Sequence, residues 1–199
     1  MNDVIGHYNL LVNEGNDPVF DSEALCEYMD KWDGPRFIDS MQLGKAKSVL
    51  EIGVGTGRLA VKTAPLCKRF VGIDISDKTI EKARQNIVSE NVKLICDDFL
   101  SFHFDEKFDV IYSTLTFMHI KEKSSAIKKV ASLLNDNGRF LLSIDKSREE
   151  FIDMVTRKIR IYPDYPENII NNITSTGLTI EEMYETEHAH IFVAKKGEV

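Results

Sequence analysis

Continuous apolar runs alternate with amphipathic segments along most of this chain. The runs predict five buried strands, at residues 48–52, 70–75, 92–96, 108–113 and 139–144. The segments between them repeat apolar residues at helical spacing, as Ile80, Ala83 and Ile87 do. They predict helices at 57–67, after Ser76 and at 121–134. Strands that alternate with amphipathic helices are typical of a parallel sheet covered on both faces.

The C-terminal quarter departs from this alternation. We expect helices near 149–159 and 167–175, followed by strands at 178–185 and 190–195. The connection between the two strands is too short for a parallel crossover, so they predict an antiparallel hairpin. The chain is therefore expected to form an α/β fold, with a doubly wound, seven-stranded, mostly parallel sheet that ends in this hairpin.

The first 45 residues predict a helical cap in front of the sheet. Leu25, Tyr28, Met29 and Trp32 follow the i, i+3, i+4, i+7 spacing of one helix face. Gly34-Pro35 then interrupts this helix and suits the start of another short one. With 199 residues, the chain is predicted to be a single domain, with the cap at 1–45 and the Rossmann-like core at 46–199.

Composition narrows the class of protein. The chain has no apolar run near the roughly 20 residues of a membrane helix, and its start lacks the features of a secretory signal. Cys26, Cys67 and Cys96 are scattered, which favours reduced thiols over a disulfide framework or a metal site. We therefore expect a cytoplasmic protein that contacts no membrane and binds no metal.

The net charge is −7, which disfavours nucleic acid as a partner because phosphate binding needs clustered cations. The one short basic cluster is formed by Arg157, Lys158 and Arg160, and a solvated face explains it better. The sequence leaves the oligomeric state open.

Residues 49–59, VLEIGVGTGRL, form the most informative stretch of the chain. A buried strand runs into a turn with glycines at 53, 55 and 57, and the turn opens a helix. Glycines at such a turn let a ligand approach the backbone closely, and the free N–H groups of the helix start add a positive end. In doubly wound folds this arrangement cradles a nucleotide-like cofactor.

The spacing E-x-G-x-G-x-G resembles motif I of the class I S-adenosylmethionine-dependent methyltransferases. A dinucleotide fingerprint would instead read G-x-G-x-x-G. The resemblance implies S-adenosylmethionine as the cofactor and S-adenosylhomocysteine as its product. It places Glu51, Gly53, Gly55 and Gly57 at the cofactor. A tight turn without a ligand is the alternative reading of this stretch.

Acidic residues follow the second and third predicted strands. Asp74 lies 17 residues after Gly57, where a carboxylate can accept both hydroxyls of a ribose in either a methyltransferase or a nicotinamide site; Ile75 is its neighbour in the candidate site. The resemblance implies that Asp97 accepts the adenine amine, with the adjacent Asp98 as the other candidate for this role. A loop acid or helix cap is the alternative.

Residues 108–120, FDVIYSTLTFMHI, resemble the strand-four segment of the same family. The resemblance implies that Ser113 and the residues just after it line the methionine end of the cofactor. The segment lacks the N/D-P-P-Y/F motif of base-specific enzymes and the Pro-Cys nucleophile of cytosine enzymes. His119 is the candidate general base because imidazole titrates near neutrality, although a packing role is the stronger reading. Tyr8 resembles a tyrosine that caps the cofactor in some relatives.

These features predict a methyltransferase that moves a methyl group to an oxygen or nitrogen atom of a small molecule by in-line attack. The protein then mainly has to align the acceptor and exclude water. Arg36, Tyr162 and Tyr165 are secondary candidates for the acceptor side. Three alternatives remain open: a protein or RNA methyltransferase on the same core, a nicotinamide-dependent oxidoreductase, and a cofactor-binding module without activity.

Overall fold

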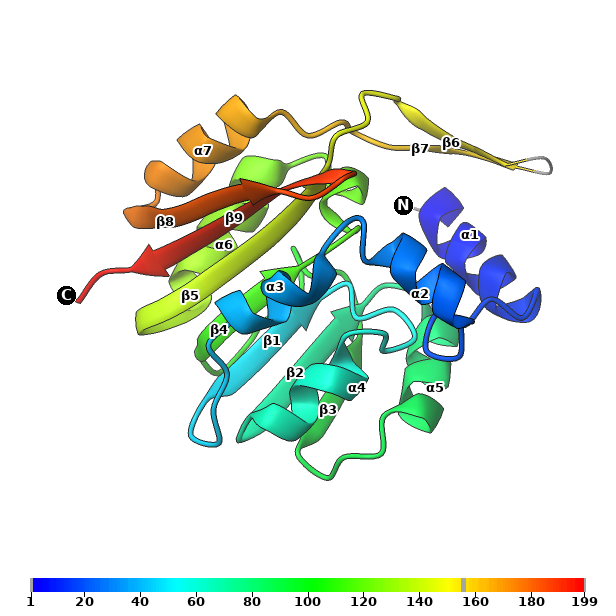
Figure 1. Ribbon diagram of the computed structural model, residues 1–199, viewed down its shortest axis with the longest axis horizontal. Helices are drawn as coiled ribbons and strands as arrows, with labels where there is room; N and C mark the ends of the chain where they lie inside the picture. The colour runs from blue at the N-terminus through cyan, green and yellow to red at the C-terminus, as the bar shows by residue number, and fades with distance from the viewer. Residues whose placement is uncertain (1, 155–156, 199) are drawn as a thin grey trace.

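A seven-stranded sheet with the order β3-β2-β1-β4-β5-β9-β8 forms the centre of the protein, as the computed structural model shows (Figure 1). The structure describes residues 2–154 and 157–198. The strands are β1 (Ser48–Ile52), β2 (Arg69–Asp74), β3 (Val92–Cys96), β4 (Phe108–Ser113), β5 (Leu134–Asp145), β8 (Leu178–Glu185) and β9 (Ala189–Lys196).

The first five strands are parallel, and the last two reverse direction. Leu50 of β1 pairs with Val71 of β2 on one side and with Ile111 of β4 on the other. Strand β9 runs antiparallel to β5, and β8 runs antiparallel to β9. The predicted fold class, including the antiparallel C-terminal hairpin, is therefore confirmed. All parallel strands end at one edge of the sheet, which is where ligands bind in such folds.

Helices cover both faces of the sheet. On one face, α6 and α7 pack over a core that includes Leu50 and Ile127; on the other, α3, α4 and α5 pack over Val49, Phe37 and Ile80. Within the described residues, none of the helices is long and apolar enough to span a membrane. The helices are α1 (Asn2–Asn13), α2 (Glu23–Met29), α3 (Gly34–Ser40), α4 (Ala60–Thr63), α5 (Asp77–Asn86), α6 (Lys123–Leu133) and α7 (Pro166–Thr174), with 3₁₀ turns η1 (Ala64–Leu66) and η2 (Phe117–His119).

The N-terminal helices lie across the edge where the parallel strands end (Figure 1). Asn9 of α1 accepts a hydrogen bond from Ser76 Oγ (2.7 Å) and donates one to Asp77 Oδ1 (2.8 Å), so α1 is tied to the start of α5. Beyond α2, Trp32 Nε1 donates to Asp145 Oδ2 at the end of β5 (2.9 Å). The predicted helical cap is thus present, and polar contacts hold it over the strand ends.

The predicted helix at 149–159 is wrong. The chain instead forms a two-stranded hairpin of β6 (Phe151–Met154) and β7 (Arg157–Arg160), in which Ile152 pairs with Ile159. Most of its side chains are exposed, so no core-facing stripe marked the segment as strand or helix. The contacts that select the hairpin are tertiary: Arg157 donates to His7 Nδ1 (2.8 Å) and pairs with Glu14 of α1.

Two other elements differ from prediction at their ends. The helix expected at 57–67 is only α4, and Pro65 follows it in the 3₁₀ turn η1, because proline has no N–H to continue a helix. Strand β5 begins at Leu134 and not at the predicted residue 139, and its pairing with β4 changes register near this end: Leu134 pairs with Phe108, and Arg139 then pairs with Val110. The polar residues between them sit outside the pairing.

Gly72, in the middle of β2, packs closely against Val54 in the turn after β1. A Cβ at this position would lie 2.9 Å from Val54 Cβ. We therefore expect Gly72→Ala to lower the free energy of unfolding by about 1–3 kcal/mol, the usual cost of overpacking. Gly44→Ala, where a Cβ meets nothing within 4 Å, is the control, with a change within about 0.5 kcal/mol. Urea unfolding measures both, and equal values would contradict the expectation.

Candidate functional site

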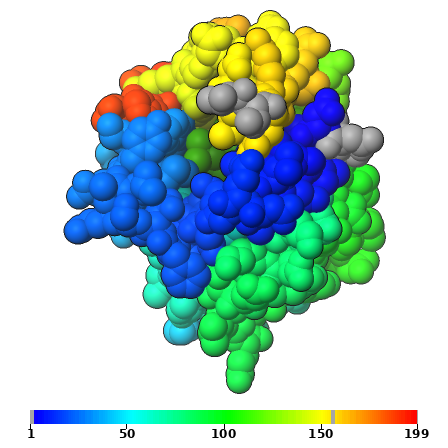
Figure 2. Space-filling view, turned by 90° about the vertical axis from the view of Figure 1, so that its right-hand side faces the viewer, coloured from blue at the N-terminus to red at the C-terminus, as the bar shows by residue number. Residues whose placement is uncertain are grey.

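A cavity of about 790 Å³ opens at the carboxyl ends of β1, β2 and β4. Its inner wall comes from the loops that follow these strands, and its outer wall comes from α1, α2 and the β6–β7 hairpin. Figure 2 shows the recess between these outer segments, where green atoms from the middle of the chain lie behind the blue helices and the yellow hairpin. A volume of this size suits a small organic ligand.

The glycine turn forms one side of the cavity. The N–H groups of Gly53 and Val54 donate to Ile73 O at 2.8 and 3.1 Å, which fixes the turn to β2. A Cβ on Gly53 would lie 1.9 Å from Thr116 Oγ1, so this position must be glycine for Thr116 to pack there. Gly55 has φ +55°, and a Cβ on it would meet no protein atom within 4 Å. The open space beside Gly55 belongs to the cavity.

Two of the residues predicted at the cofactor lie outside the cavity lining. Gly57 faces the body of the protein, where a Cβ would lie 2.9 Å from Ile87. Ser113 is fully buried, and its Oγ donates to Ile52 O (2.9 Å), which joins β4 to β1. Thr114 and Leu115, the next two residues, do line the cavity. Gly57 and Ser113 thus help to fix the glycine turn and the end of β4, but they do not face the cavity.

Asp74 lies beside the glycine turn, as its position at the end of β2 predicted. Its Oδ2 accepts the Gly55 N–H (3.0 Å), and its Oδ1 accepts the Ser76 N–H (3.0 Å). Burial raises the pKa of its carboxyl, against these hydrogen bonds, which lower it. Its neighbour Ile75 also lines the cavity. The carboxylate is therefore held in one orientation by backbone donors from two different strand ends.

Asp97 and Asp98 both line the cavity beyond β3. Asp97 Oδ1 accepts the Asp98 N–H (2.7 Å), and Asp98 Oδ1 accepts the Leu100 N–H (3.2 Å), so each acid also shapes its own loop. Phe99 and Leu100 line the same part of the cavity. This combination of apolar surface and carboxylate oxygens can hold a flat heterocycle that carries an amino group.

Glu51 is a buried carboxyl at the floor of the cavity. It is 3% exposed, and Tyr112 Oη donates to its Oε2 (2.8 Å). Burial raises the pKa of Glu51 to about 8, although the hydrogen bond from Tyr112 and the charge of Arg58 act to lower it. The carboxyl is therefore largely protonated at neutral pH, and it can either donate or accept a hydrogen bond.

An ion pair that sequence reasoning missed lies next to Glu51. Arg58 follows the last glycine of the turn, and its guanidinium pairs with Asp33 at the N-terminus of α3. Thr114 Oγ1 also donates to Asp33 (3.2 Å). The position of Arg58 directly after Gly57 was a usable signal, but nothing in the sequence connects Asp33 to it. The pair joins the helical cap to the glycine turn.

Tyr8 and His119 meet across the cavity, although 111 positions separate them in the chain. Tyr8 Oη lies 2.8 Å from His119 Nε2, and the two rings are perpendicular. Burial lowers the pKa of His119 to about 4, and burial together with the charge of Asp74 raises the pKa of Tyr8. Both groups are therefore neutral at pH 7. His119 Nδ1 is buried without a hydrogen-bond partner among the described residues.

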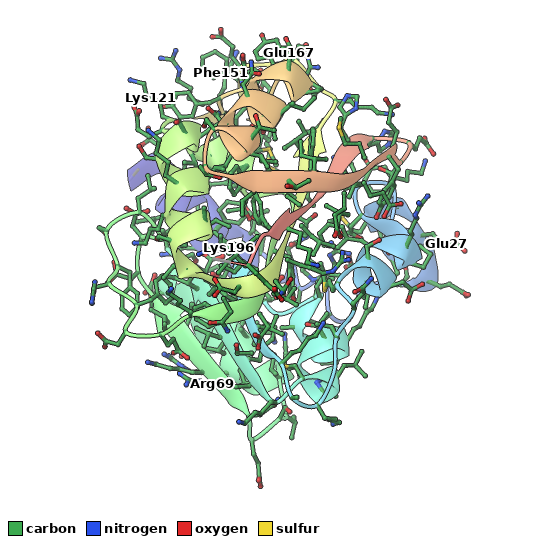
Figure 3. All side chains as sticks on the ribbon, turned by 90° about the vertical axis from the view of Figure 1, so that its left-hand side faces the viewer. Glu27, Arg69, Lys121, Phe151, Glu167 and Lys196 are labelled. Carbon is green, nitrogen blue, oxygen red and sulfur yellow. The ribbon has the colours of Figure 1, made fainter. Side chains whose placement is uncertain are left out.

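The outer wall of the cavity is mostly apolar. Helix α2 has no buried residue, yet Leu25, Tyr28 and Met29 line the cavity. Figure 3 shows Glu27 of the same helix pointing away from the protein. The apolar face predicted for this helix thus faces the ligand space, and only its last predicted member, Trp32, lies elsewhere.

The three secondary candidates separate in the structure. Tyr162 lines the cavity, and its N–H donates to Met118 O (2.7 Å). Tyr165 lines a different, shallower pocket. Arg36 forms an ion pair with Glu182 and stacks on Tyr184, at the edge of the sheet and outside the cavity lining. Of the three, only Tyr162 is placed to contact a molecule in this cavity.

The residues present fit an adenosyl amino acid. Asp74 offers oxygen atoms to a sugar, the loop after β3 offers a slot for a base, and Gly55 leaves room for a ligand against the backbone. The charged groups near Glu51 suit the zwitterionic end of such a ligand. Within the described residues, no group of three or more His, Cys, Asp or Glu could hold a metal ion.

Comparison with known proteins agrees with this geometry. The family described as a methyltransferase domain matches residues 43–195. An uncharacterised methyltransferase of Anoxybacillus flavithermus is 32% identical over 80% of this chain and 78% of its own length.

Two solved structures share the fold. The N-methyltransferase NodS of Bradyrhizobium japonicum, in complex with S-adenosylhomocysteine, has a TM-score of 0.72 at 21% identity and covers 96% of this chain and 98% of its own. Magnesium protoporphyrin IX methyltransferase of Synechocystis, with bound S-adenosylmethionine, has a TM-score of 0.65 at 20% identity and covers 86% and 79%.

The family match removes the nicotinamide-dependent oxidoreductase from the alternatives. The sheet supports the same conclusion, because its last two strands, β9 and β8, form an antiparallel hairpin. The chain belongs to the methyltransferase domain family and is an S-adenosylmethionine-dependent methyltransferase.

Proposed function

We propose that this protein methylates an oxygen or nitrogen atom of an apolar small molecule, which enters between α1, α2 and the β6–β7 hairpin. The observation that carries this proposal is the apolar outer half of the cavity. Leu11 comes from α1, Leu25 and Met29 come from α2, and Ile159 comes from the hairpin. An apolar acceptor would cover these side chains and gain the free energy of their burial.

The inner half of the cavity is the proposed cofactor site. Asp74 would hold the ribose, Asp97 or Asp98 would hold the adenine amine, and the backbone at Gly55 would lie against the ligand. S-adenosylmethionine supplies, when bound, a methyl carbon that its sulfonium has already activated. The remaining task of the protein is to align the acceptor and to exclude water, which the cap and the hairpin are placed to do.

The state of His119 bears on the kind of acceptor. A ring with a pKa of about 4 is a weak base at neutral pH, so it is poorly matched to general-base catalysis. The acceptor then has to arrive with a free lone pair, as a carboxylate or a neutral amine does. In this proposal Tyr8 and His119 orient the acceptor through hydrogen bonds, and neither removes its proton.

A macromolecular acceptor is the second candidate, and two observations disfavour it. The cavity lies beneath the cap and the hairpin, so a protein or RNA would have to reach through the recess. Two of the three cations of the basic cluster on the hairpin are also in ion pairs, Arg157 with Glu14 and Lys158 with Asp153. Magnesium protoporphyrin IX methyltransferase, which shares the fold, acts on a small molecule according to its name.

Ligand binding tests the cofactor half. S-adenosylhomocysteine at 100 times its Kd should stabilise the protein by about 2.7 kcal/mol. For a domain of this size that corresponds to a rise in Tm of roughly 5–10 °C, measured by differential scanning fluorimetry. NADH at the same concentration should leave Tm unchanged. Stabilisation by NADH alone would refute the proposal.

Acceptor screening tests the outer half. We expect tritiated S-adenosylmethionine to label apolar carboxylic acids or amines in a small-molecule panel, with unfractionated tRNA and a mixed peptide pool run in parallel. Labelling confined to the tRNA or to the peptides would replace the small-molecule acceptor by a macromolecular one.

Gly55→Val should abolish binding of S-adenosylhomocysteine, because the branched side chain would stand in the open space beside the turn. The substitution also strains a backbone with φ +55°. Gly177→Val is the matched control: Gly177 has φ +82° and a Cβ on it would meet no atom within 4 Å, but it lies outside the cavity lining. Isothermal titration calorimetry should show normal binding for this control. Normal affinity in the Gly55 variant would place the ligand elsewhere.

The pKa of His119 predicts how stability depends on pH. Above pH 6.5 the His119 ring is mostly neutral in both the folded and the unfolded chain. Between pH 6.5 and about pH 4 the ring is protonated in the unfolded chain but stays neutral in the folded protein, so the unfolded state binds more protons and stability falls as the pH falls. Between pH 7 and pH 5 the wild type should therefore lose on the order of 2 kcal/mol more than a His119→Gln variant. Urea unfolding at the two pH values measures this. Equal losses would show that His119 titrates normally.

A further inference from the structure

The hydrogen bond between Tyr8 and His119 leaves one polar hydrogen free beside the cavity that both residues line. His119 Nδ1 is buried and has no hydrogen-bond partner among the described residues. Because buried N–H groups without an acceptor are rare, we assign the ring proton to Nε2, which then donates to Tyr8 Oη (2.8 Å). Burial and the charge of Asp74 raise the pKa of Tyr8, so its hydroxyl stays protonated. Tyr8 O–H can therefore donate to a molecule in the cavity.

The loop after β4, which carries His119, uses its own carbonyl oxygens. Four of them accept hydrogen bonds from within the protein, those of Thr114, Thr116, Phe117 and Met118. One of these bonds, from the Tyr162 N–H to Met118 O (2.7 Å), fixes the segment after the β6–β7 hairpin to this loop. A ligand at this wall therefore meets a free donor in Tyr8, whereas these four acceptors are already engaged.

A free O–H group distinguishes a carboxylate from an amine. A carboxylate has two oxygens, so one can accept the hydrogen bond from Tyr8 while the other keeps a lone pair for attack. A neutral amine has a single lone pair, and a hydrogen bond from Tyr8 would occupy the pair that has to attack. An alkylamine also arrives protonated at neutral pH, and His119, with a pKa of about 4, is too weak a base to take up that proton.

We propose that the acceptor is an apolar carboxylic acid that becomes a methyl ester, and that Tyr8 binds its carboxylate while His119 positions Tyr8. This inference rests on the proposed function, because it assumes that S-adenosylmethionine occupies the inner half of the cavity with its methyl group toward the end of β4. One carboxylate oxygen forms a bond to the methyl carbon as the carbon–sulfur bond breaks, and the electron pair of the broken bond stays on sulfur. No proton moves.

The apolar outer wall suits this reaction. Leu25 and Met29 of α2 and Ile159 of the hairpin line the cavity there. The negative charge of the carboxylate and the positive charge of the sulfonium disappear together, whereas methylation of a neutral amine would leave a cation beside these side chains. Because charged groups are costly in apolar surroundings, the wall favours the reaction that removes both charges.

The chemistry of the product tests the acceptor class. Decanoate and phenylbutanoate are each offered with tritiated S-adenosylmethionine, beside decylamine and phenylbutylamine. The acids should be labelled faster than the amines by about 10- to 100-fold, the usual value of a hydrogen bond to a charged group. Mild base should release the label as volatile methanol, because it hydrolyses methyl esters. If no acid is labelled, or if the label resists base, the carboxylate is overturned; a labelled amine would still leave a small-molecule methyltransferase.

Binding tests the role of Tyr8 without turnover. Isothermal titration calorimetry measures decanoate and decylamine on protein saturated with S-adenosylhomocysteine. Tyr8→Phe should weaken binding of decanoate by about 10- to 100-fold and that of decylamine by less than about threefold. Tyr165→Phe removes the hydroxyl of a tyrosine that lines the other pocket, and it should behave like the wild type. An equal loss for both ligands in Tyr8→Phe would show that Tyr8 only packs, and would overturn its role.

Two variants of His119 test its positioning role. The amide of His119→Gln can donate to Tyr8 Oη in place of Nε2, and it should keep the preference for decanoate over decylamine within about threefold of the wild type. His119→Leu cannot donate and should reduce this preference by about 10-fold. Equal preferences in the two variants would show that His119 does not position Tyr8.

The failure of the proposed function has a different signature. Wild-type protein that does not bind S-adenosylhomocysteine, or that labels only tRNA or peptides, would refute the proposed function, and this inference would fail with it.

Discussion

The backbone of the turn after β1 is the constraint on which the rest of the site depends. Its N–H groups at Gly53 and Val54 donate to Ile73 O of β2, and the next N–H, at Gly55, donates to Asp74. The ends of two parallel strands are therefore locked together, and the carboxylate of one strand is oriented by the turn of the other. Because Gly55 has no side chain, the space above this junction stays open to a ligand. The helical cap and the β6–β7 hairpin form the outer wall of the cavity that begins at this junction.

The parallel core could be predicted because its signals are local. Buried strands appear as apolar runs, and helices between them repeat at 3.6 residues, so every strand of the core was found. The β6–β7 hairpin was missed because its side chains are mostly exposed and Arg157, which ties it to α1, meets His7 and Glu14 from the other end of the chain. The sequence of the hairpin alone does not contain that contact.

The candidate site likewise contains residues that the sequence predicted and contacts that it could not predict. The motif supplied Gly55, Asp74 and the acids after β3, because the spacing of a motif reflects the geometry of adjacent strand ends. It could not tell which glycine faces the cavity and which faces the body of the protein, so the position of Gly57 against Ile87 emerged only from the structure. Contacts between distant segments, such as Tyr8 with His119 and Asp33 with Arg58, produce no regular spacing in the sequence, so sequence patterns cannot predict them.

Helix α2 contributes no buried residue to the core, and this has an evolutionary consequence. Substitutions on its inward face change the lining of the cavity, which in the proposed function meets the acceptor, yet they remove little packing from the folded protein and so cost little stability. The half of the cavity formed by the strand ends is tied to the sheet and tolerates far less. If the acceptor lies against the cap, as proposed, selection can alter the acceptor through α2 without changing the strand ends that would hold the methyl donor.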